Sequence, residues 1–326
     1  IISPDKVTVG FYNVENLFDT DDEPGVNDNE FTPEGDKNWT EERYYEKLDN
    51  ISKVVNTMNK TDWPVILGLA EVENKDVLED LINQKDLVDA RYGIVHFDSP
   101  DERGIDVALL YRKEFFQVLK KTSIDLHNPD FPNSKTRDLL HVKGQFFNGE
   151  IFHFFVNHWS SRRKGTLETE PKRMFQAAQL KKEVDAITAN APDEKIVIMG
   201  DFNDYPTDKS IKKVLKAKRN RKKVNTKGIY NPYENLFKNG IGTTAYRDSW
   251  SLFDQIMVTK PLLERDFSSY RFYKAGIFNK NYLVNNKGKY KGYPYRSFSN
   301  SGFTNGYSDH FPVYIYVIKE VKSNSG

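Results

Sequence analysis

The sequence has 326 residues, and its 48 Lys and Arg residues against 47 Asp and Glu residues give a net charge of only +1. Such a balance indicates no overall preference for an acidic or a basic partner. Hydrophobic residues make up 38% of the chain and aromatic residues 13%, which excludes a disordered protein, and no apolar run is long enough to span a membrane. Because cysteine is absent, disulfides, thiolate metal sites and a cysteine nucleophile are excluded.

Short runs rich in β-branched and aromatic residues recur along the chain, each bounded by Gly, Pro, Asn or Asp, and such runs predict strands. The predicted strands are Val7–Val14, Val65–Val72, Asp106–Arg112, Leu139–Phe147, Ile151–His158, Ile196–Phe202, Leu252–Val258 and Phe311–Ile318.

Helical patterns lie between these strands. Thr40 is a suitable N-cap for an amphipathic helix over Glu41–Lys60, Asn74 for a second, and Pro171 lies near the start of a third. Strands mixed with helices, several of them in β-β pairs, predict an α/β fold with a mixed sheet. Since neither an internal repeat nor a linker is visible, we predict one domain over residues 1–326.

Polar residues stand where several predicted strands begin or end. They are Asn13, Glu71, Asp201 with Asn203, and Asp309 with His310. Burying such groups is costly, so their recurrence favours a convergent polar site at one edge of the sheets. Alternation along a strand predicts that Asp201 and Asn203 face the same side. Oxygen donors with few histidines suit Mg²⁺, or Mn²⁺, which keeps water ligands for a substrate phosphate.

The same residues form blocks of sequence: Tyr-Asn13-Val-Glu-Asn, Ala-Glu71-Val, Asn157-His158-Trp, Gly-Asp201-Phe-Asn203, Phe-Asp254-Gln-Ile and Ser-Asp309-His310-Phe-Pro. This set resembles the endonuclease/exonuclease/phosphatase family, which has the deoxyribonuclease I-like fold, and the blocks follow the family's order from about Val7 to Val317. The resemblance implies a four-layer sandwich in which two packed mixed β-sheets are flanked by helices. It also implies divalent-metal-dependent cleavage of phosphate esters.

The resemblance further implies a metal site. Glu71 would bind the metal directly, with Asn13 and Asp309 beside it holding the metal or its waters. Each of these residues has an ordinary structural explanation when taken alone, as a turn former or an acid at a strand end. Their joint occurrence in the family's order favours the site.

By the same resemblance, five further residues would act on the substrate. Asp201 and Asn203 would position the attacking water and the scissile phosphate. His310 would be a general base or a phosphate clamp, oriented by Asp254. His158 would stabilise the charge of the transition state or protonate the leaving oxygen. Phosphoryl transfer requires an in-line nucleophile and positive charge on the phosphoryl oxygens, which such a set can supply.

Weaker candidates lie nearby. Asp106 could support His158, as an acid does in some relatives, and a surface salt bridge with Arg103 is an equal alternative. Arg162, Arg163 and Lys164 follow His158 and could contact substrate phosphates, although an exposed basic turn is an equal interpretation.

Three segments depart from the average composition. Asp19–Asp36 has eight acidic residues and no basic one, and we interpret it as a solvated loop, because Pro24 occupies the position that a calcium loop gives to Gly. Lys212–Lys227 has nine basic and no acidic residues. Phe267–Ser308 has seven basic residues, twelve aromatic ones and no acid. We predict that the last two are loop additions on the substrate side; a cationic surface over a small aromatic core is the alternative for Phe267–Ser308.

Our first functional hypothesis is a Mg²⁺-dependent phosphodiesterase that cleaves nucleic acid. The alternatives are a phosphatase or phospholipase-C-type hydrolase of a phosphorylated lipid or small molecule, and a binding module without activity. The presence of Glu71, Asp201 and His310 argues against the binding module. No obligate protein partner is evident. No signal peptide is visible, and the compartment stays open, with an exported, periplasmic or extracellular, location as our expectation.

Overall fold

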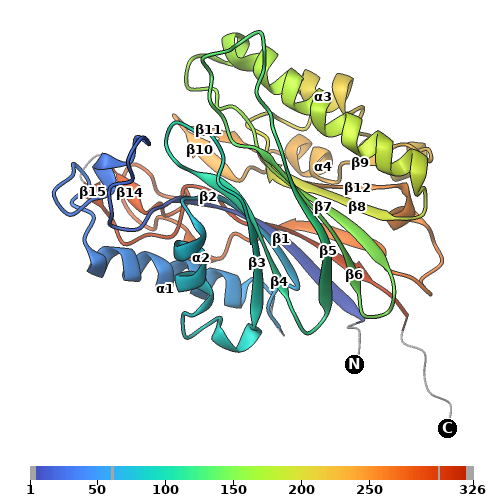
Figure 1. Cartoon of the computed structure of the whole chain (residues 1–326), viewed down its shortest axis with the longest axis horizontal. Coiled ribbons are helices and arrows are strands. Elements are labelled where there is room, and N and C mark those ends of the chain that lie inside the picture. Colours follow the sequence, from blue (N-terminus) through green and yellow to red (C-terminus); the bar gives the residue numbers. More distant parts are fainter. Residues whose placement is uncertain (1–4, 60–61, 300–301, 321–326) are drawn as a thin grey trace.

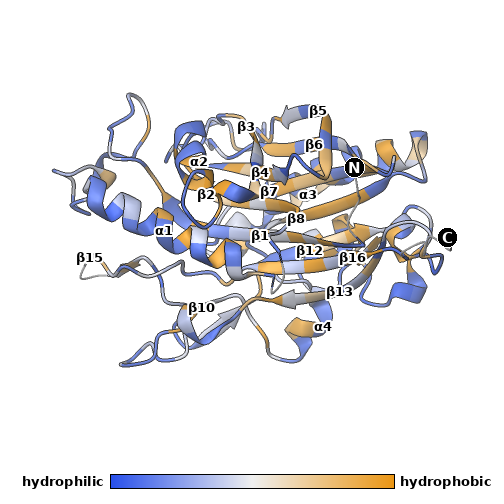
Figure 2. Ribbon diagram, turned by 90° about the horizontal axis from the view of Figure 1, so that it is seen from below, coloured by the Kyte–Doolittle hydropathy of each residue, from blue (hydrophilic) through white to orange (hydrophobic). Residues whose placement is uncertain are grey.

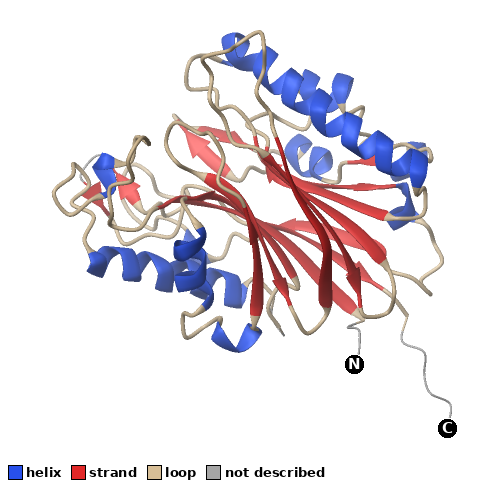
Figure 3. Cartoon of the chain, in the orientation of Figure 1, coloured by secondary structure: helices blue, strands red, loops and turns tan. Residues whose placement is uncertain are grey.

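Two six-stranded mixed sheets pack face to face, and helices cover their outer surfaces in the computed structural model of the chain (Figures 1 and 3). The structure describes residues 5–59, 62–299 and 302–320. This arrangement confirms the predicted α/β sandwich. None of the helices in the described ranges is long and apolar enough to cross a membrane.

The first sheet has the strand order β13-β16-β1-β2-β4-β3, in which only β1 and β2 are parallel. Its strands are β1 (Lys6–Leu17), β2 (Ile66–Val72), β3 (Tyr92–His96), β4 (Asp106–Arg112), β13 (Arg271–Ile277) and β16 (Val313–Ile318). The helices α1 (Glu41–Thr57) and α2 (Lys75–Ile82) pack their apolar residues on its outer face.

The second sheet has the order β5-β6-β7-β8-β12-β9, in which only β7 and β8 are parallel. Its strands are β5 (Phe116–Ile124), β6 (Leu139–Phe146), β7 (Ile151–His158), β8 (Lys195–Asp201), β9 (Ile229–Tyr230) and β12 (Asp254–Thr259). Its outer face is covered by α3 (Thr166–Asn190), while α4 (Tyr233–Lys238) lies beside β12.

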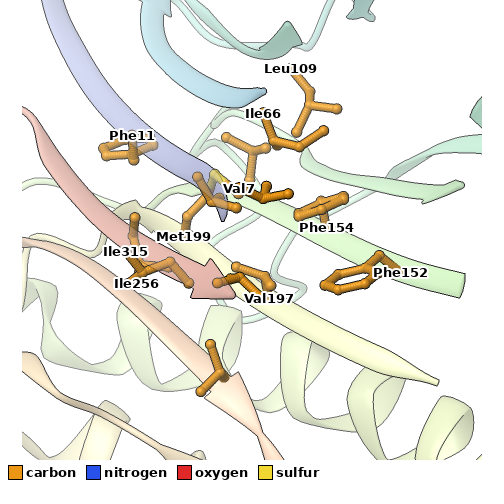
Figure 4. Close-up of a cluster of buried hydrophobic side chains, with 14 of the residues drawn as sticks. Val7, Phe11, Ile66, Leu109, Phe152, Phe154, Val197, Met199, Ile256 and Ile315 are labelled. Atoms are coloured by element: carbon orange, nitrogen blue, oxygen red, sulfur yellow. The ribbon is translucent and has the colours of Figure 1, made fainter. Parts of the chain in front are cut away.

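The main core lies between the sheets. Phe11 and Ile66 from the first sheet meet Phe154, Met199 and Ile256 from the second, and all five are fully buried (Figure 4). Figure 2 shows the hydrophobic residues gathered along the central strands and hydrophilic residues on the peripheral loops. Burial of each such side chain contributes roughly 1.5–3 kcal/mol, so this interface holds the strand ends in fixed positions.

The helix starts follow the predicted capping chemistry with one exception. The side chains of Thr40 and Asn74 accept hydrogen bonds from the first turns of α1 and α2. α3 begins at Thr166, five residues before Pro171, which lies inside the helix. The position is tolerated because the proline removes only an early helical hydrogen bond, to Leu167. The expected end of α1 at Lys60 lies outside the described residues.

Short elements complete the fold: the hairpins β10 (Thr244–Tyr246) with β11 (Ser249–Ser251) and β14 (Phe298–Ser299) with β15 (Gly302–Phe303), and the single turns Asn29–Phe31, Val88–Ala90, Ser210–Val214, Arg221–Lys223, Lys260–Leu263 and Asn281–Leu283.

The prediction that the whole of Phe267–Ser308 is a loop addition needs correction. β13 lies inside Phe267–Ser308 and is an edge strand of the first sheet. In the remainder of that segment, Phe298 and Phe303 pack on Trp39 beside α1, and Tyr282 packs on Tyr307, which agrees with the small aromatic core that was the alternative.

The structure also contradicts the predicted position of Lys212–Lys227 on the substrate side. This segment runs to the end of β8 opposite Asp201, where Thr226 and Lys195 line a common cavity and Arg221 bonds to the carbonyl of Leu263. β8 has seven residues, so its two ends lie about 20 Å apart. Basic composition by itself does not determine which end of a sheet a loop occupies.

Candidate active site

Asn13 and Glu71 lie at irregularities near the ends of the neighbouring parallel strands β1 and β2. Glu15, Asn16 and Glu71 adopt φ angles of 53°, 54° and 64°, a region that costs energy for residues other than glycine. The bulges turn the side chains toward the second sheet. The Asn13 amide donates to Oε1 of Glu71 at 3.3 Å, and the main-chain N–H of Asn16 donates to Oε2 at 3.1 Å.

Three functional side chains of the second sheet are brought together by strand register. Asp201 ends β8, with His158 of β7 as its partner on one side and Asp254 of β12 on the other. The Asn13 amide also donates to Oδ2 of Asp201 at 3.1 Å, which joins the two sheets at the site. Nε2 of His158 lies 3.8 Å from both Oε1 of Glu71 and Oδ2 of Asp201.

His310 reaches this group from the loop before β16. Its Nδ1 lies 2.7 Å from Oδ2 of Asp254, which also accepts a hydrogen bond from the Thr243 hydroxyl. Its Nε2 lies 3.9 Å from carboxylate oxygens of Asp201 and Asp309. Because Asp254 holds Nδ1, Nε2 is the atom of His310 that is free to contact a ligand.

The pKa values of the two active-site histidines are shifted in opposite directions. Burial, followed by the positive charges of Arg137 and Arg103, lowers the pKa of His158 well below its usual value. Burial would also lower the pKa of His310, but Asp254 and Asp201 raise it well above the usual value. At neutral pH these shifts favour a neutral His158 and a protonated His310.

Burial and the neighbouring Asp254 raise the pKa of Asp201 to about 7. Nδ1 of His158 is buried, and no described residue provides it with a hydrogen-bond partner. Since carboxylates flank the other nitrogen of this neutral ring, electrostatics favours the tautomer with the proton on Nε2.

Asn203 lines the cleft, but alternation along a strand, the predicted reason, does not place it there. β8 ends at Asp201, and Asn203 has a φ of 47°, so strand alternation does not extend to it. Its main-chain N–H donates to Oδ1 of Asp201 at 2.9 Å, and its amide donates to the carbonyl of Trp159 at 3.0 Å. A tight turn positions this side chain.

The three basic residues after β7 separate into two roles. Arg162 donates to Asp204 at 2.8 Å, to Asp208, and to the carbonyl of Asn203 at 2.6 Å, and it lies over the ring of Tyr205. Its guanidinium therefore supports the Asn203 turn. Arg163 and Lys164 line the cleft, and neither forms an ion pair with any described residue.

Two acidic residues lie elsewhere than the sequence analysis expects. The idea that Asp106 supports His158 is wrong, because Asp106 bonds to His96 at 3.1 Å and to Ser99. Asp309 lies at the rim of the site with its side chain 34% exposed, 3.9 Å from Nε2 of His310 and 3.4 Å from Arg296.

Other residues of the site escaped the sequence analysis. Arg296 donates to Oε1 of the buried Glu15 at 2.9 and 3.0 Å, and the main-chain N–H of Ser297 donates to Oε2. Burial and Asp309 raise the pKa of Glu15 to about 7. Arg137 holds the carbonyls of His158 and Trp159. Glu15 stands within the block of Asn13, which was a usable signal, whereas nothing in the sequence connects Arg296 or Arg137 with the site.

The site lies at the floor of a cleft of about 1080 Å³. Glu71, His158, Asp201, Asn203 and His310 all line it. Its walls contain basic residues, namely Arg103, Lys135, Arg163, Lys164 and Lys172, and also acidic ones, among them Glu30, Glu102 and Asp130.

The donor set at the floor fits a hard divalent cation. Glu71 and Asp201 supply carboxylate oxygens from the two sheets, and Asn13 donates its amide to both while its own oxygen accepts from the N–H of Glu15. Burial and Asp254 raise the pKa of Asp201, so its ionised form would be stabilised by a cation. Asp201, Asp254 and His310 also lie close enough to hold an ion. Because His310 and Asp254 already form a hydrogen bond, we assign that group to acid–base chemistry instead.

Comparisons with known proteins agree with this geometry. The fold resembles D. rerio TDP2 complexed with single-strand DNA product, with a TM-score of 0.57 and 14% identity over 96% of this chain and 99% of that one. It resembles a Bacteroides thetaiotaomicron mannosyl-6-phosphatase, with a TM-score of 0.59 and 19% identity over 96% and 99%. It also resembles an endonuclease/exonuclease/phosphatase family protein from the same organism, with a TM-score of 0.59 and 19% identity over 98% of each chain.

At these identities the likeness establishes the fold alone, and no curated protein matches the sequence significantly. The model of the Endonuclease/Exonuclease/phosphatase family, in contrast, matches residues 8–319. That range includes every residue of the site described above, and phosphoester hydrolysis is the activity that this match supports. The chain belongs to the endonuclease/exonuclease/phosphatase family.

Proposed function

We propose that the protein is a Mg²⁺-dependent phosphodiesterase that cleaves nucleic-acid phosphodiester bonds by in-line attack of an activated water. The observation behind this proposal is the convergence of Glu71, Asp201, His158 and His310 on the floor of one open cleft. Mn²⁺ would suit the same oxygen donors.

The residues divide the work of phosphoryl transfer. When held by Glu71, with Asn13 beside it, the cation would polarise a phosphoryl oxygen and offset its charge. The carboxylate of Asp201, which lines the floor of the cleft, would accept a hydrogen bond from the attacking water. The Asn203 turn orients that water. The protonated His310 and the Nε2–H of His158 donate to oxygens of the phosphoryl group as charge develops.

A polymeric substrate is favoured by the size and charge of the cleft. Its volume of about 1080 Å³ slightly exceeds the range of roughly 300–1,000 Å³ that is usual for small-molecule pockets. Arg163 and Lys164 have no ion-pair partner among the described residues and are available to backbone phosphates. The structural similarity to a TDP2 bound to single-strand DNA product is in line with this choice.

A phosphatase acting on a phosphorylated small molecule is the second candidate. Glu30, Glu102 and Asp130 on the cleft wall would repel a long polyanion, and one structural neighbour is a mannosyl-6-phosphatase. A phosphorylated lipid belongs to the same alternative.

The deciding experiment compares substrates side by side under Mg²⁺ and EDTA control. Plasmid DNA, single-stranded DNA, RNA, bis-p-nitrophenyl phosphate, mannose 6-phosphate and a phosphoinositide are offered to the wild type and to His310→Ala. We expect Mg²⁺-dependent cleavage of a nucleic acid that His310→Ala loses. Turnover of only the phosphomonoesters would establish the second candidate instead.

A further inference from the structure

Three aromatic side chains form a partly exposed surface beside the active site. Trp250 on β11 is 37% exposed, and Tyr290, in the turn before β14, is 53% exposed. Tyr293 lies between them, with its ring centroid 6.1 Å from that of Trp250 and 5.7 Å from that of Tyr290. We call Trp250, Tyr290 and Tyr293 the aromatic platform. A single exposed apolar residue needs no explanation, whereas adjoining ones mark an interaction site.

Hydrogen bonds fix the platform in place. The main-chain N–H of Asp248, at the tip of the hairpin labelled β10 and β11 in Figure 1, donates to the hydroxyl of Tyr293 at 2.7 Å. That hydroxyl donates to Oδ1 of Asp248 at 2.6 Å. The turn that carries Tyr290 is closed by the N–H of Asn285, which donates to the carbonyl of Tyr293 at 2.8 Å. Because these groups are already ordered, a ligand that binds to them loses little affinity to ordering.

The platform adjoins the edge of the cleft at which His310 lies. Trp250 stacks on Phe311, with the ring centroids 6.0 Å apart and the planes inclined by 20°. Phe311 directly follows His310, which lines the cleft. At the base of the hairpin, the carbonyl of Thr243 accepts from the N–H of Phe311 at 2.7 Å, and the hydroxyl of Thr243 donates to Asp254. A chain molecule with one group at His310 can therefore extend onto Trp250.

Positive charges surround the platform. Lys287, Lys289 and Lys291 are exposed in the same turn as Tyr290, and none of them forms an ion pair with a described residue. Nζ of Lys289 lies 5.7 Å from the centroid of the Tyr290 ring. Aromatic rings interleaved with free cations are typical of surfaces that bind single-stranded nucleic acid, in which the rings stack on bases and the cations contact phosphates.

We propose that the aromatic platform is a base-stacking site for unpaired nucleobases of a single strand whose backbone enters the cleft at His310. The bases of a duplex are stacked on one another and present no free face to Trp250 or Tyr290. The platform would thus select single-stranded over double-stranded substrate. This inference rests on the proposed nucleic-acid substrate and adds the form in which that substrate is bound.

The test measures the binding of three labelled probes by fluorescence anisotropy, in EDTA so that metal-dependent cleavage does not occur. The probes are a short oligothymidylate, a duplex of the same length, and an abasic strand that keeps every phosphate but has no bases. We expect the wild type to bind the oligothymidylate more tightly than either of the others. Trp250→Ala and Tyr290→Ala should each weaken binding of the oligothymidylate by about 5–150-fold, the contribution of one stacked base.

The abasic strand separates stacking from attraction between charges. Trp250→Ala should leave the affinity for this strand unchanged, since no base is present to be lost from the ring. Trp250→Phe keeps an aromatic face and should retain most of the affinity for the oligothymidylate. Tyr273, which is 59% exposed near the start of β13, provides the control, because Arg271 and the strand start pair with Ile318 at the end of β16 away from His310. Tyr273→Ala should bind all three probes as the wild type does.

Three results would overturn the inference: equal affinity of the wild type for the normal and the abasic strand, equal affinity for the single strand and the duplex, or equal losses on both single strands in Trp250→Ala. Tyr290→Ala, in an exposed turn, decides the matter if Trp250→Ala does not fold. Mg²⁺-dependent cleavage of nucleic acid by the wild type, assayed in parallel, keeps the two proposals distinct. Its presence together with any of the three results overturns the platform alone, and its absence overturns the proposed function.

Discussion

Nδ1 of His310 lies 2.7 Å from Oδ2 of Asp254, although 56 residues separate them in the sequence. The contact leaves Nε2 of the same imidazole 3.9 Å from Oδ2 of Asp201. Asp254 and Asp201 are register partners on β12 and β8, so the sheet itself sets the distance between the carboxylate that orients the ring and the one that the ring faces.

The first prediction concerns this pair. His310→Ala should lose about 10²–10⁴-fold in turnover, the usual contribution of a positioned acid–base group. Asp254→Ala should lose somewhat less. The double variant should resemble His310→Ala, because Asp254 has no catalytic role once the imidazole is absent. The check is a double-mutant cycle on kcat, with thermal unfolding to confirm the fold; losses that multiply would mean that the two residues act independently.

The second prediction concerns Glu71. Glu71→Gln keeps an oxygen that can accept from Asn16 but removes the charge that holds the cation. We expect an intact fold and a greatly increased Mg²⁺ requirement, measured as the Mg²⁺ concentration for half-maximal activity. Unchanged activity at limiting Mg²⁺ would falsify the assignment of Glu71 as the metal ligand.

The sequence predicts the central strands and most of the site because both depend on local patterns. Asn13, Glu71 and Asp201 stand at strand ends, where a polar residue after an apolar run is visible in one dimension. The edge strand β5 was missed because its residues are largely half-buried or exposed, so that no continuous apolar run marks it.

Other features depend on contacts that no local pattern records. Arg137 supports His158 across 21 residues, and Arg296 reaches Glu15 across 281. The basic run Lys212–Lys227 had the composition of a substrate-binding loop, yet it runs to the wrong end of β8. Charge composition indicates what a segment can bind, whereas the topology decides what it can reach.

The third prediction compares the neighbours Arg162 and Arg163. Arg162→Ala removes ion pairs to Asp204 and Asp208 and the bond to the Asn203 carbonyl, so it should destabilise the fold by about 2 kcal/mol and also lower kcat. Arg163→Ala should leave the stability unchanged and raise KM. Urea unfolding and steady-state kinetics on both variants check this. Equal effects of the two variants on stability would contradict the division of roles.

The fourth prediction concerns the salt dependence of nucleic-acid binding. Each phosphate contact that is removed lowers the slope of log K against log salt by about 0.7–0.9. Reversing Arg163 and Lys164 on the cleft wall should therefore flatten the slope, and reversing Lys222 and Lys223, in the run that leads to the far end of β8, should not.

A further variant in the same titration tests the exposed lysines of the segment before β14, namely Lys287, Lys289 and Lys291. Their reversal should flatten the slope as well, because the turn that they occupy adjoins Trp250, which stacks on Phe311 beside His310. An unaltered slope would mean that this turn is structural and would strengthen the small-substrate alternative.

The fifth prediction concerns acid stability and a histidine pair outside the active site. Nε2 of His141 on β6 lies 2.8 Å from Nδ1 of His153 on β7, and the His141 ring stacks on Phe155. Nε2 of His153 lies 2.6 Å from Glu194. Burial, followed by the neighbouring His153, lowers the pKa of His141 to about 3.

A histidine with a lowered pKa in the folded state binds fewer protons there than in the unfolded chain, where its pKa is about 6.5. Protonation therefore stabilises the unfolded state as the pH falls from 6.5 toward 3. Between pH 7.5 and pH 5, this residue lowers the free energy of unfolding by about 2 kcal/mol. His141→Gln keeps a hydrogen-bonding partner for His153 and removes the titration. Urea unfolding at the two pH values should show a smaller loss in His141→Gln than in the wild type. The exposed His127 gives the control, because His127→Gln should leave the loss unchanged. Equal losses in the wild type and His141→Gln would mean that His141 is protonated in the folded protein at pH 5, and that the His141–His153 pair opens to admit the proton.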